Sequence, residues 1–213
     1  MGANPTPPRP SLSSLTSPAA RPGGRTARTR KVVLDAAIEQ LLDGGLVGFS
    51  VGAVAARSGV HPSTIYRRWG TRERLAVDAL LDRVDAAIPI PDTGALATDV
   101  RQLLGDLAAF YGTRLGAVVG HLAMAPLEDP AAEGVRQLLW DTRLREVEAI
   151  VERAAARGEI GRRVDPRSAV EALLAQLHLH VLTLGHPADA PTLDAFTRAA
   201  VAAVRALDDA EPR

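Results

Sequence analysis

The chain has 213 residues, of which 46% are hydrophobic, and it contains no cysteine. A chain of this length can bury a sizeable core in one or two domains, and the lack of cysteine excludes a disulfide framework and thiol chemistry. Its 25 basic and 25 acidic residues cancel, but residues 1–75 hold eleven Arg and Lys against four Asp and Glu. This basic N-terminal part would attract phosphates, and the acidic remainder would repel them.

No apolar run reaches the length of a membrane span, and the N-terminus lacks the apolar segment of a secretory signal. We therefore expect a cytoplasmic protein without a membrane partner. Residues 1–25 are rich in Pro and Ser. They predict a disordered basic arm, because prolines prevent a helix and few apolar side chains are available for a core. This arm is either an inert tail or reaches a DNA minor groove through Arg21, Arg25 and Arg28.

A first helix is expected over residues 26–43, where apolar side chains recur at the i, i+3, i+4, i+7 spacing of one helical face. The members of this stripe are Leu34, Ala37, Ile38 and Leu41. Gly44 and Gly45 follow directly and are expected to end the helix, since glycine is a common C-terminal cap.

Residues 50–73, SVGAVAARSGVHPSTIYRRWGTRE, predict two short helices joined by a tight turn. Ser50 can cap the first helix through its hydroxyl, and Gly59 suits the positive φ that such a turn needs. In the second helix Ile65 and Trp69 lie four residues apart, so they would face inward together. The outward face then carries polar and basic side chains. This is the layout of a DNA-binding helix-turn-helix, with the second helix as the reading helix.

The stretch GFSVGAVAARSGVHPSTIYRRWGTRERL resembles the N-terminal signature of the TetR (tetracycline-repressor) family of bacterial regulators. An alanine-containing helix is followed by a Gly-Val turn, the triplet Thr-Ile-Tyr, a basic pair, an aromatic residue and a basic residue before a Leu. The match covers residues 28–80 and is specific, because several independent constraints agree at fixed spacing. The resemblance implies a dimeric regulator that binds DNA with its N-terminal helices.

The resemblance also implies which residues meet DNA. Thr64 and Tyr66 would anchor phosphates. Side-chain chemistry, and not the resemblance, makes His61, Ser63 and Arg67 the candidates for base edges, since Arg pairs with guanine and Ser is unselective. Two basic residues near the start of the first helix would either touch phosphate or remain ordinary solvated charges. These two residues are Arg30 and Lys31. The other members of the expected interface are Ser50, Val51, Pro62, Arg68 and Arg72.

A connecting helix is expected over residues 72–88, with Thr71 as its cap, and a break rich in Pro and Gly follows at residues 89–94. The expected apolar stripe of this helix is Val77, Leu81, Val84 and Ile88. The predicted units are a helix-turn-helix domain over 26–74, a connecting helix over 75–91 and a C-terminal regulatory and dimerisation domain over 92–210.

The part of the chain after this break is predicted to be helical throughout. Helices are expected over residues 95–115, 117–125, 128–156, 166–184 and 191–207. Apolar side chains occupy most of the circumference of residues 168–184, and the last helix is dense in Ala. A helix that is apolar all round must be covered on both sides, which predicts a two-fold dimer; the alternative is a wholly intramolecular core. The expected dimer contacts are Leu173, Leu177, His180, Leu184, Phe196, Ala200, Ala203 and Val204.

No motif predicts catalysis or metal binding, so we expect no enzyme, no cofactor and no metal site. Walker A, G-x-S-x-G and dinucleotide fingerprints are absent. Side chains that lean into the helical body could instead hold an unidentified small-molecule effector. For Trp140 and His178 the alternative is a structural role in the core. The effector candidates are Tyr111, Arg114, His121, Met124, Trp140 and His178.

Together these patterns predict an all-α protein of about nine helices, with a three-helix DNA-binding domain and a C-terminal helical domain for ligand binding and dimerisation. The expected function is a ligand-responsive repressor that binds a palindromic operator on double-stranded DNA as a homodimer. The alternative is a transcriptional activator or an architectural DNA binder without an effector. A helical enzyme or ligand carrier is a third, less favoured, interpretation.

Overall fold

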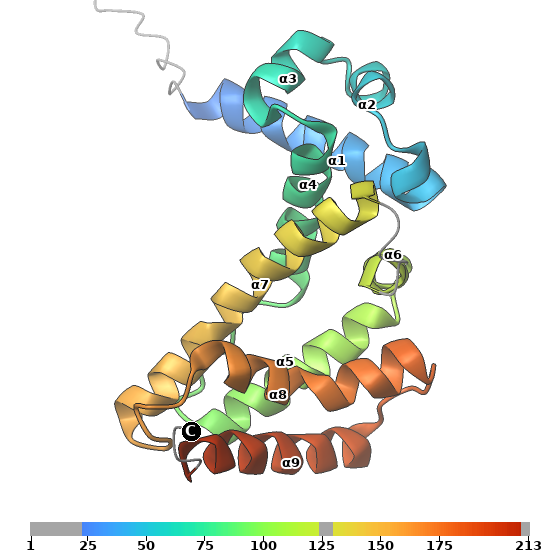
Figure 1. Cartoon of the computed structure of the whole chain (residues 1–213). Coiled ribbons are helices and arrows are strands. Elements are labelled where there is room, and N and C mark those ends of the chain that lie inside the picture. Colours follow the sequence, from blue (N-terminus) through green and yellow to red (C-terminus); the bar gives the residue numbers. More distant parts are fainter. Residues whose placement is uncertain (1–22, 124–129, 210–213) are drawn as a thin grey trace, which may run out of the picture.

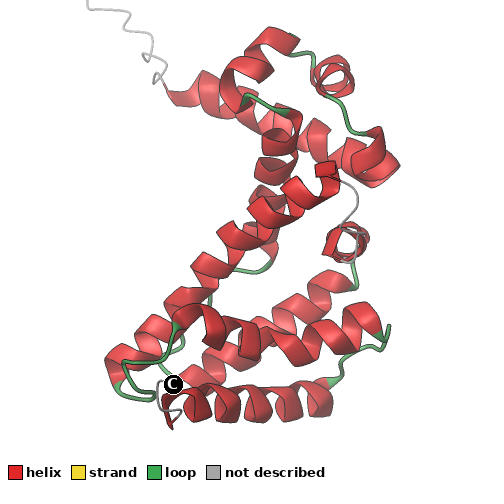
Figure 2. Cartoon of the chain, in the orientation of Figure 1, coloured by secondary structure: helices red, strands yellow, loops and turns green. Residues whose placement is uncertain are grey.

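The computed structural model describes residues 23–123 and 130–209, and within these ranges it contains nine α-helices and one π-helical turn. The N-terminal helices form a head that is joined to a longer helical body (Figure 1). Every regular element of the described part is a helix (Figure 2), so the prediction of an all-α fold is confirmed. Most of the predicted N-terminal arm and the effector candidate Met124 lie outside the described residues.

The head contains α1 (Gly23–Gly48), α2 (Val51–Ser58) and α3 (Pro62–Trp69). The predicted stripe of α1 is confirmed, because its four members are at most 7% exposed. The predicted end of this helix at the glycine pair is instead a bend. Gly45 there adopts φ 59° and ψ −163°, a combination open essentially only to glycine, and the chain resumes a short helical segment after it.

Local capping sets the ends of α2 and α3. The Ser50 hydroxyl accepts the backbone N–H of Ala53 at 3.2 Å, and Gly59 ends α2 with φ 67°, as predicted. His61 caps α3, since its Nδ1 accepts the backbone N–H of Ser63 at 3.3 Å. This cap was not predicted, because His is not among the usual N-cap residues.

α4 (Arg72–Ala87) packs against α1 on the head side and against α7 on the body side. Its cap is Thr71, whose hydroxyl accepts the Arg74 N–H at 3.1 Å. Its buried side is wider than the predicted stripe: Leu80 is 1% exposed, whereas Leu81 is only half-buried. A helix in contact with two neighbours must bury more than one narrow stripe.

The body consists of α5 (Leu96–Tyr111), α6 (Arg114–Ala123), α7 (Pro130–Arg157), α8 (Pro166–His178) and α9 (Ala190–Asp209), with the π-helical turn Leu179–Thr183 continuing α8. α7 begins near the head and runs alongside α4 towards the far end of the body, where α5, α8 and α9 pack together (Figure 1). None of the described helices is both long enough and apolar enough to cross a membrane.

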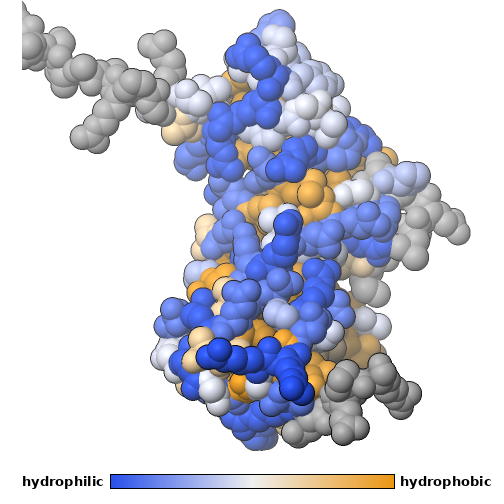
Figure 3. Space-filling model, turned by 60° about the vertical axis from the view of Figure 1, so that its left-hand side comes forward, coloured by the Kyte–Doolittle hydropathy of each residue, from blue (hydrophilic) through white to orange (hydrophobic). Residues whose placement is uncertain are grey.

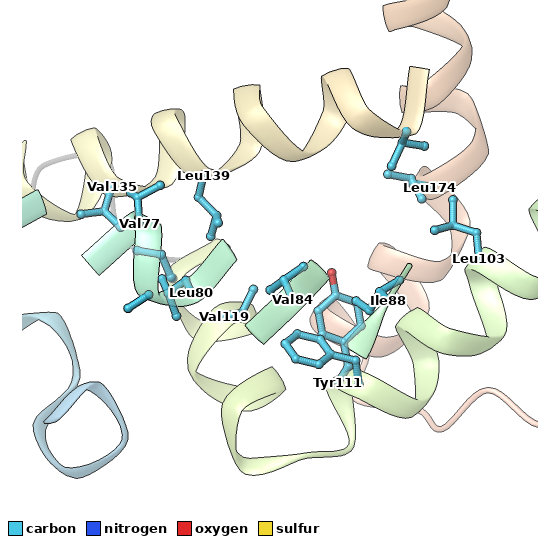
Figure 4. Close-up of a cluster of buried hydrophobic side chains, with 14 of the residues drawn as sticks. Val77, Leu80, Val84, Ile88, Leu103, Tyr111, Val119, Val135, Leu139 and Leu174 are labelled. Atoms are coloured by element: carbon cyan, nitrogen blue, oxygen red, sulfur yellow. The ribbon is translucent and has the colours of Figure 1, made fainter. Parts of the chain in front are cut away.

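One hydrophobic core continues from the head into the body. Near the head, Val77 and Leu80 of α4 lie close to Val135 of α7, and further along the same helix Val84 approaches Tyr111 of α5 (Figure 4). Burial of apolar surface stabilises the fold by about 25 cal/mol per Å². The shared core therefore resists separation of the head from the body.

Asp99 is a fully buried carboxylate that ties the start of α5 to the end of α7. It accepts the backbone N–H of Thr93 at 2.6 Å and the Thr93 hydroxyl at 2.7 Å, and it faces Arg157 Nη2 at 3.4 Å. Arg157 also pairs with Glu159 at 2.6 Å, and Glu159 accepts the N–H of Leu96 at 2.9 Å. A buried charge is tolerated only with such partners.

We expect Asp99→Ala to lower the free energy of unfolding by about 3 kcal/mol, because it leaves the Thr93 N–H without its acceptor and removes one of the two carboxylates that pair with Arg157. Urea denaturation at a fixed protein concentration measures this change. Asp106→Ala on the same helix is the matched control, since no described residue pairs with Asp106, and it should change stability by less than about 0.5 kcal/mol. Equal losses for the two variants would contradict the assignment.

Candidate nucleic-acid interface

α3 has one buried face and one exposed face. Ile65 and Trp69 are 0% and 7% exposed, and Trp69 Nε1 donates to Asp78 Oδ2 on α4 at 3.0 Å. These contacts fix the helix against the head. The opposite face displays Tyr66, which is 52% exposed, and the exposed Arg67. The predicted inward and outward faces of α3 are therefore confirmed.

The exposed side chains of α3 differ in how firmly they are held. The Arg68 guanidinium lies 5.3 Å from the centroid of the Trp69 ring, a cation–π contact that restricts its position. His61 Nδ1 and Ser63 Oγ are 2.8 Å apart and hold each other. Within the described part of the chain, no hydrogen bond or ion pair engages Arg67 or the Tyr66 hydroxyl. These two side chains are therefore free to bind an external partner.

A groove of about 410 Å³ runs between the start of α1 and the side of α3. Its lining combines hydroxyl groups, two guanidinium groups and a small apolar floor. The lining residues are Thr26, Thr29, Val33, Val60, Thr64, Arg67, Arg68 and Trp69. Hydroxyl and guanidinium groups are common phosphate contacts in protein–DNA complexes. The residues that sequence reasoning missed are Thr26 and Thr29, although their i, i+3 spacing on α1 places them on one face.

Several predicted DNA contacts are already engaged inside the head. Arg30 pairs with Asp82 of α4 at 2.7 Å, and Arg72 pairs with Glu73 at 2.7 Å while donating to the Phe49 carbonyl at 3.2 Å. Both arginines therefore join elements of the head, and a DNA role for them stays a prediction.

The other members of the expected interface differ in exposure. Lys31 is exposed and pairs with the half-buried Asp35 at 3.3 Å, and Pro62 is half-buried in the first turn of α3. The Ser50 hydroxyl is occupied as a helix cap. The structure corrects a side-chain role for Val51: its side chain is 3% exposed and packs in the head core, so it cannot contact DNA through that side chain.

The effector candidates do not form one site. The Tyr111 hydroxyl lies 3.0 Å from His178 Nε2, and the ring centroids of Trp140 and His178 are 5.6 Å apart, so these three side chains make a packed cluster between α5, α7 and α8. Arg114 and His121 instead lie on α6, at the junction of the head and the body. Within the described residues, no group of three or more His, Asp or Glu side chains is arranged to hold a metal ion.

Burial sets the protonation of the cluster. It lowers the pKa of His178 to about 4 and raises the pKa of the Tyr111 hydroxyl, against the opposing effect of the Arg143 charge. His178 is therefore neutral near pH 7. The protonated Tyr111 hydroxyl can then donate to Nε2, which is consistent with a structural hydrogen bond in the core.

The structure also corrects the expected dimer surface. Four of its members pack inside the subunit and are at most 3% exposed, which leaves no side-chain surface for a partner. These are Leu173, Leu177, Ala200 and Val204. The remaining four keep exposed surface, with Leu184 at 54%, and stay predictions: His180, Leu184, Phe196 and Ala203.

The surface in Figure 3 is largely hydrophilic, with hydrophobic patches below the head and at the far end of the body.

A firmly anchored helix with an exposed basic and polar face, carried on an all-helical body, defines a helix-turn-helix DNA-binding regulator. Two family descriptions match the chain. They are "Bacterial regulatory proteins, tetR family" over residues 33–79 and "Tetracyclin repressor-like, C-terminal domain" over residues 90–200. The chain belongs to the TetR family of bacterial transcriptional regulators, and the resemblance inferred from residues 28–80 is confirmed.

Individual relatives agree with this assignment. The HTH-type transcriptional regulator AqdR of Rhodococcus erythropolis is 36% identical over 79% of this chain and 80% of its own length. The DNA-binding transcriptional repressor TetR of Mycobacteroides abscessus is 34% identical over 77% and 85%. The crystal structure of the TetR family transcription regulator SCO0332 has a TM-score of 0.65 at 29% identity, over 87% of this chain and 100% of that chain.

A more distant structure shares the fold. The regulator FadR from Bacillus subtilis, solved in complex with stearoyl-CoA, has a TM-score of 0.56 at 17% identity, over 82% of this chain and 97% of that chain. The helical architecture is thus kept at low sequence identity.

We expect acid to destabilise the protein through His178. The unfolded side chain binds a proton near pH 6.5, whereas the folded one resists it until about pH 4, so stability falls as the pH drops between these values. Between about pH 7 and about pH 5 this contribution amounts to about 2 kcal/mol. Urea denaturation of the parent and of His178→Gln at both pH values measures it as the difference between their pH dependences. The exposed His186→Gln is the control, and a His178→Gln variant with the parent's pH dependence would refute the claim.

Proposed function

We propose that the protein is a ligand-responsive repressor that binds a palindromic operator as a homodimer. The observation that supports this most directly is the face of α3, where Tyr66 and Arg67 stand free while Ile65 and Trp69 hold the helix to the head. In this proposal residues 26–74 read DNA, residues 92–210 bind the effector and the partner subunit, and α4 connects the two.

α3 would lie in the major groove. Arg67 would pair with a guanine edge, with His61 and Ser63 beside it, while Thr64 and Tyr66 would hold phosphates. Ser63 and His61 bind each other at 2.8 Å, so a base contact by either must share or replace that hydrogen bond. Arg68, held over Trp69, is better placed to provide a fixed positive charge beside the DNA backbone.

A palindromic operator requires two heads related by a two-fold axis. The exposed apolar side chains near the end of α8 provide a surface for such a dimer: Leu179 is 55% exposed and Leu184 is 54% exposed. Phe196 of α9 is only partly covered, and its ring contacts His180 at 5.2 Å between centroids. Burial of these groups against a second copy would remove apolar surface from water.

We expect Arg67→Ala and Tyr66→Ala each to weaken operator binding by about 1–3 kcal/mol. A binding sequence is first selected from a random library of double-stranded DNA with the parent protein, and fluorescence anisotropy then compares the variants on that sequence. Arg205→Ala, an exposed arginine on α9, is the matched control and should bind like the parent. If both α3 variants also bind like the parent at moderate salt, α3 is not the reading helix.

We expect Leu184→Asp to shift the protein from a dimer towards the monomer of 22.4 kDa, because a carboxylate would be buried without a partner at the interface. Sedimentation equilibrium measures the shift. Val32→Asp replaces another exposed apolar residue, 40% exposed on α1, and should leave the dimer intact. A dimer of unchanged stability in Leu184→Asp would place the interface elsewhere.

A further inference from the structure

A cavity of about 670 Å³ lies where the head meets the body. The last turns of α1 form one side of it, α6 forms the other, and α4 and α7 contribute one residue each. The described lining residues are Leu41, Leu42, Gly44, Gly45, Leu46, Val47, Leu80, Arg114, Ala117, Val118, His121, Leu122 and Ala132. Small-molecule sites typically have volumes of about 300–1,000 Å³, so this cavity is large enough for an organic ligand.

The lining has one clear chemical character. Leucine, valine, alanine and glycine make up all of it except Arg114 and His121, and no acidic side chain is among the described lining residues. Such a surface matches a molecule with an apolar body and one anionic group, because Arg forms paired, charge-assisted hydrogen bonds with carboxylates. The pocket beside Trp140 and His178 is smaller, about 180 Å³, and its described lining contains Glu171 but no Arg or Lys to bind an anion.

Arg114 connects this cavity to the head. Its Nη2 donates to the Leu42 carbonyl at 2.8 Å, and it lies 3.6 Å from a carboxylate oxygen of Asp43. Its side chain is nevertheless 68% exposed, so the guanidinium can exchange partners at low cost. The α1 segment that it holds leads directly into Gly45, where the helix bends.

We infer that this junction cavity is the effector site, which the C-terminal domain shares with α1 and α4, and that it takes a small monocarboxylate with an apolar body, with Arg114 as the carboxylate partner. The inference names the ligand class of the proposed function and rests on it. A bound carboxylate competes with the Leu42 carbonyl and with Asp43 for the same guanidinium. The ligand therefore acts on the contact between α6 and α1, and it would regulate DNA binding by favouring a head position in which this contact is broken.

The test uses decanoate and 1-decanol, which share an apolar chain and differ in the anionic group. Isothermal titration calorimetry measures their binding to the full chain without DNA. Arg114→Gln should weaken decanoate binding about tenfold and leave 1-decanol unchanged, since it removes one charge-assisted pair. Arg145→Gln is the matched control, because Arg145 is also exposed and donates to a backbone carbonyl, that of Asp141, at 2.8 Å.

A second pair of variants tests the cavity itself. Ala117→Phe fills it and should weaken both probes at least tenfold, whereas Ala97→Phe, at an exposed position of α5, should weaken neither. Circular dichroism confirms that each variant is folded. Decanoate binding that is absent from the parent, or equal in the parent, Arg114→Gln and Ala117→Phe, would overturn the inference. These ligand-binding results do not change the operator-binding measurements. Failure of this inference can therefore be distinguished from failure of the proposed DNA-binding function.

Discussion

The packing of α4 between α1 and α7 is the constraint on which the rest of the structure depends. α4 is the only described helix that makes extensive contact with both the head and the longest helix of the body. Its buried residues belong to the same continuous core as those of α1 and α7. Because packed interiors deform little, a displacement of α7 or α6 must be passed on to α4 and α1 rather than absorbed locally.

Ion pairs fix how α4 is aligned against its neighbouring helices. Arg30 and Asp82 join α1 to α4 in the head, and Arg143, which is 7% exposed, reaches Asp85 and donates to the Ile88 carbonyl at the other end of α4. Burial together with the Glu146 charge raises the pKa of Asp85, so proximity to Arg143 only partly offsets its cost. Apolar burial thus provides most of the stability, and the charged groups fix how the helices are aligned.

The position of α3 also depends on the packing of α4. Trp69 is held by Asp78 of α4, and Arg68 rests on the Trp69 ring, so the position of the reading face follows the position of α4. On the other side of the head, Arg114 of α6 holds α1 at Leu42, just before the helix bends at Gly45. The DNA-reading face and the junction cavity are therefore connected through α1 and α4, two helices that pack on each other.

The sequence by itself determined the order of the helices, the caps at Ser50 and Thr71, and the family, because these depend on residues a few positions apart: Ser50 with Ala53, Ile65 with Trp69, and the motif of residues 50–73. Tertiary structure decided which charges remain free and which apolar faces remain exposed. Arg30 was a candidate phosphate contact in the sequence, but it pairs with a residue 52 positions away. Likewise Leu173 and Leu184 belong to one predicted apolar helix, and only the subunit's own packing buries the first and exposes the second. No local periodicity carries that information, since it arises from contacts between distant helices.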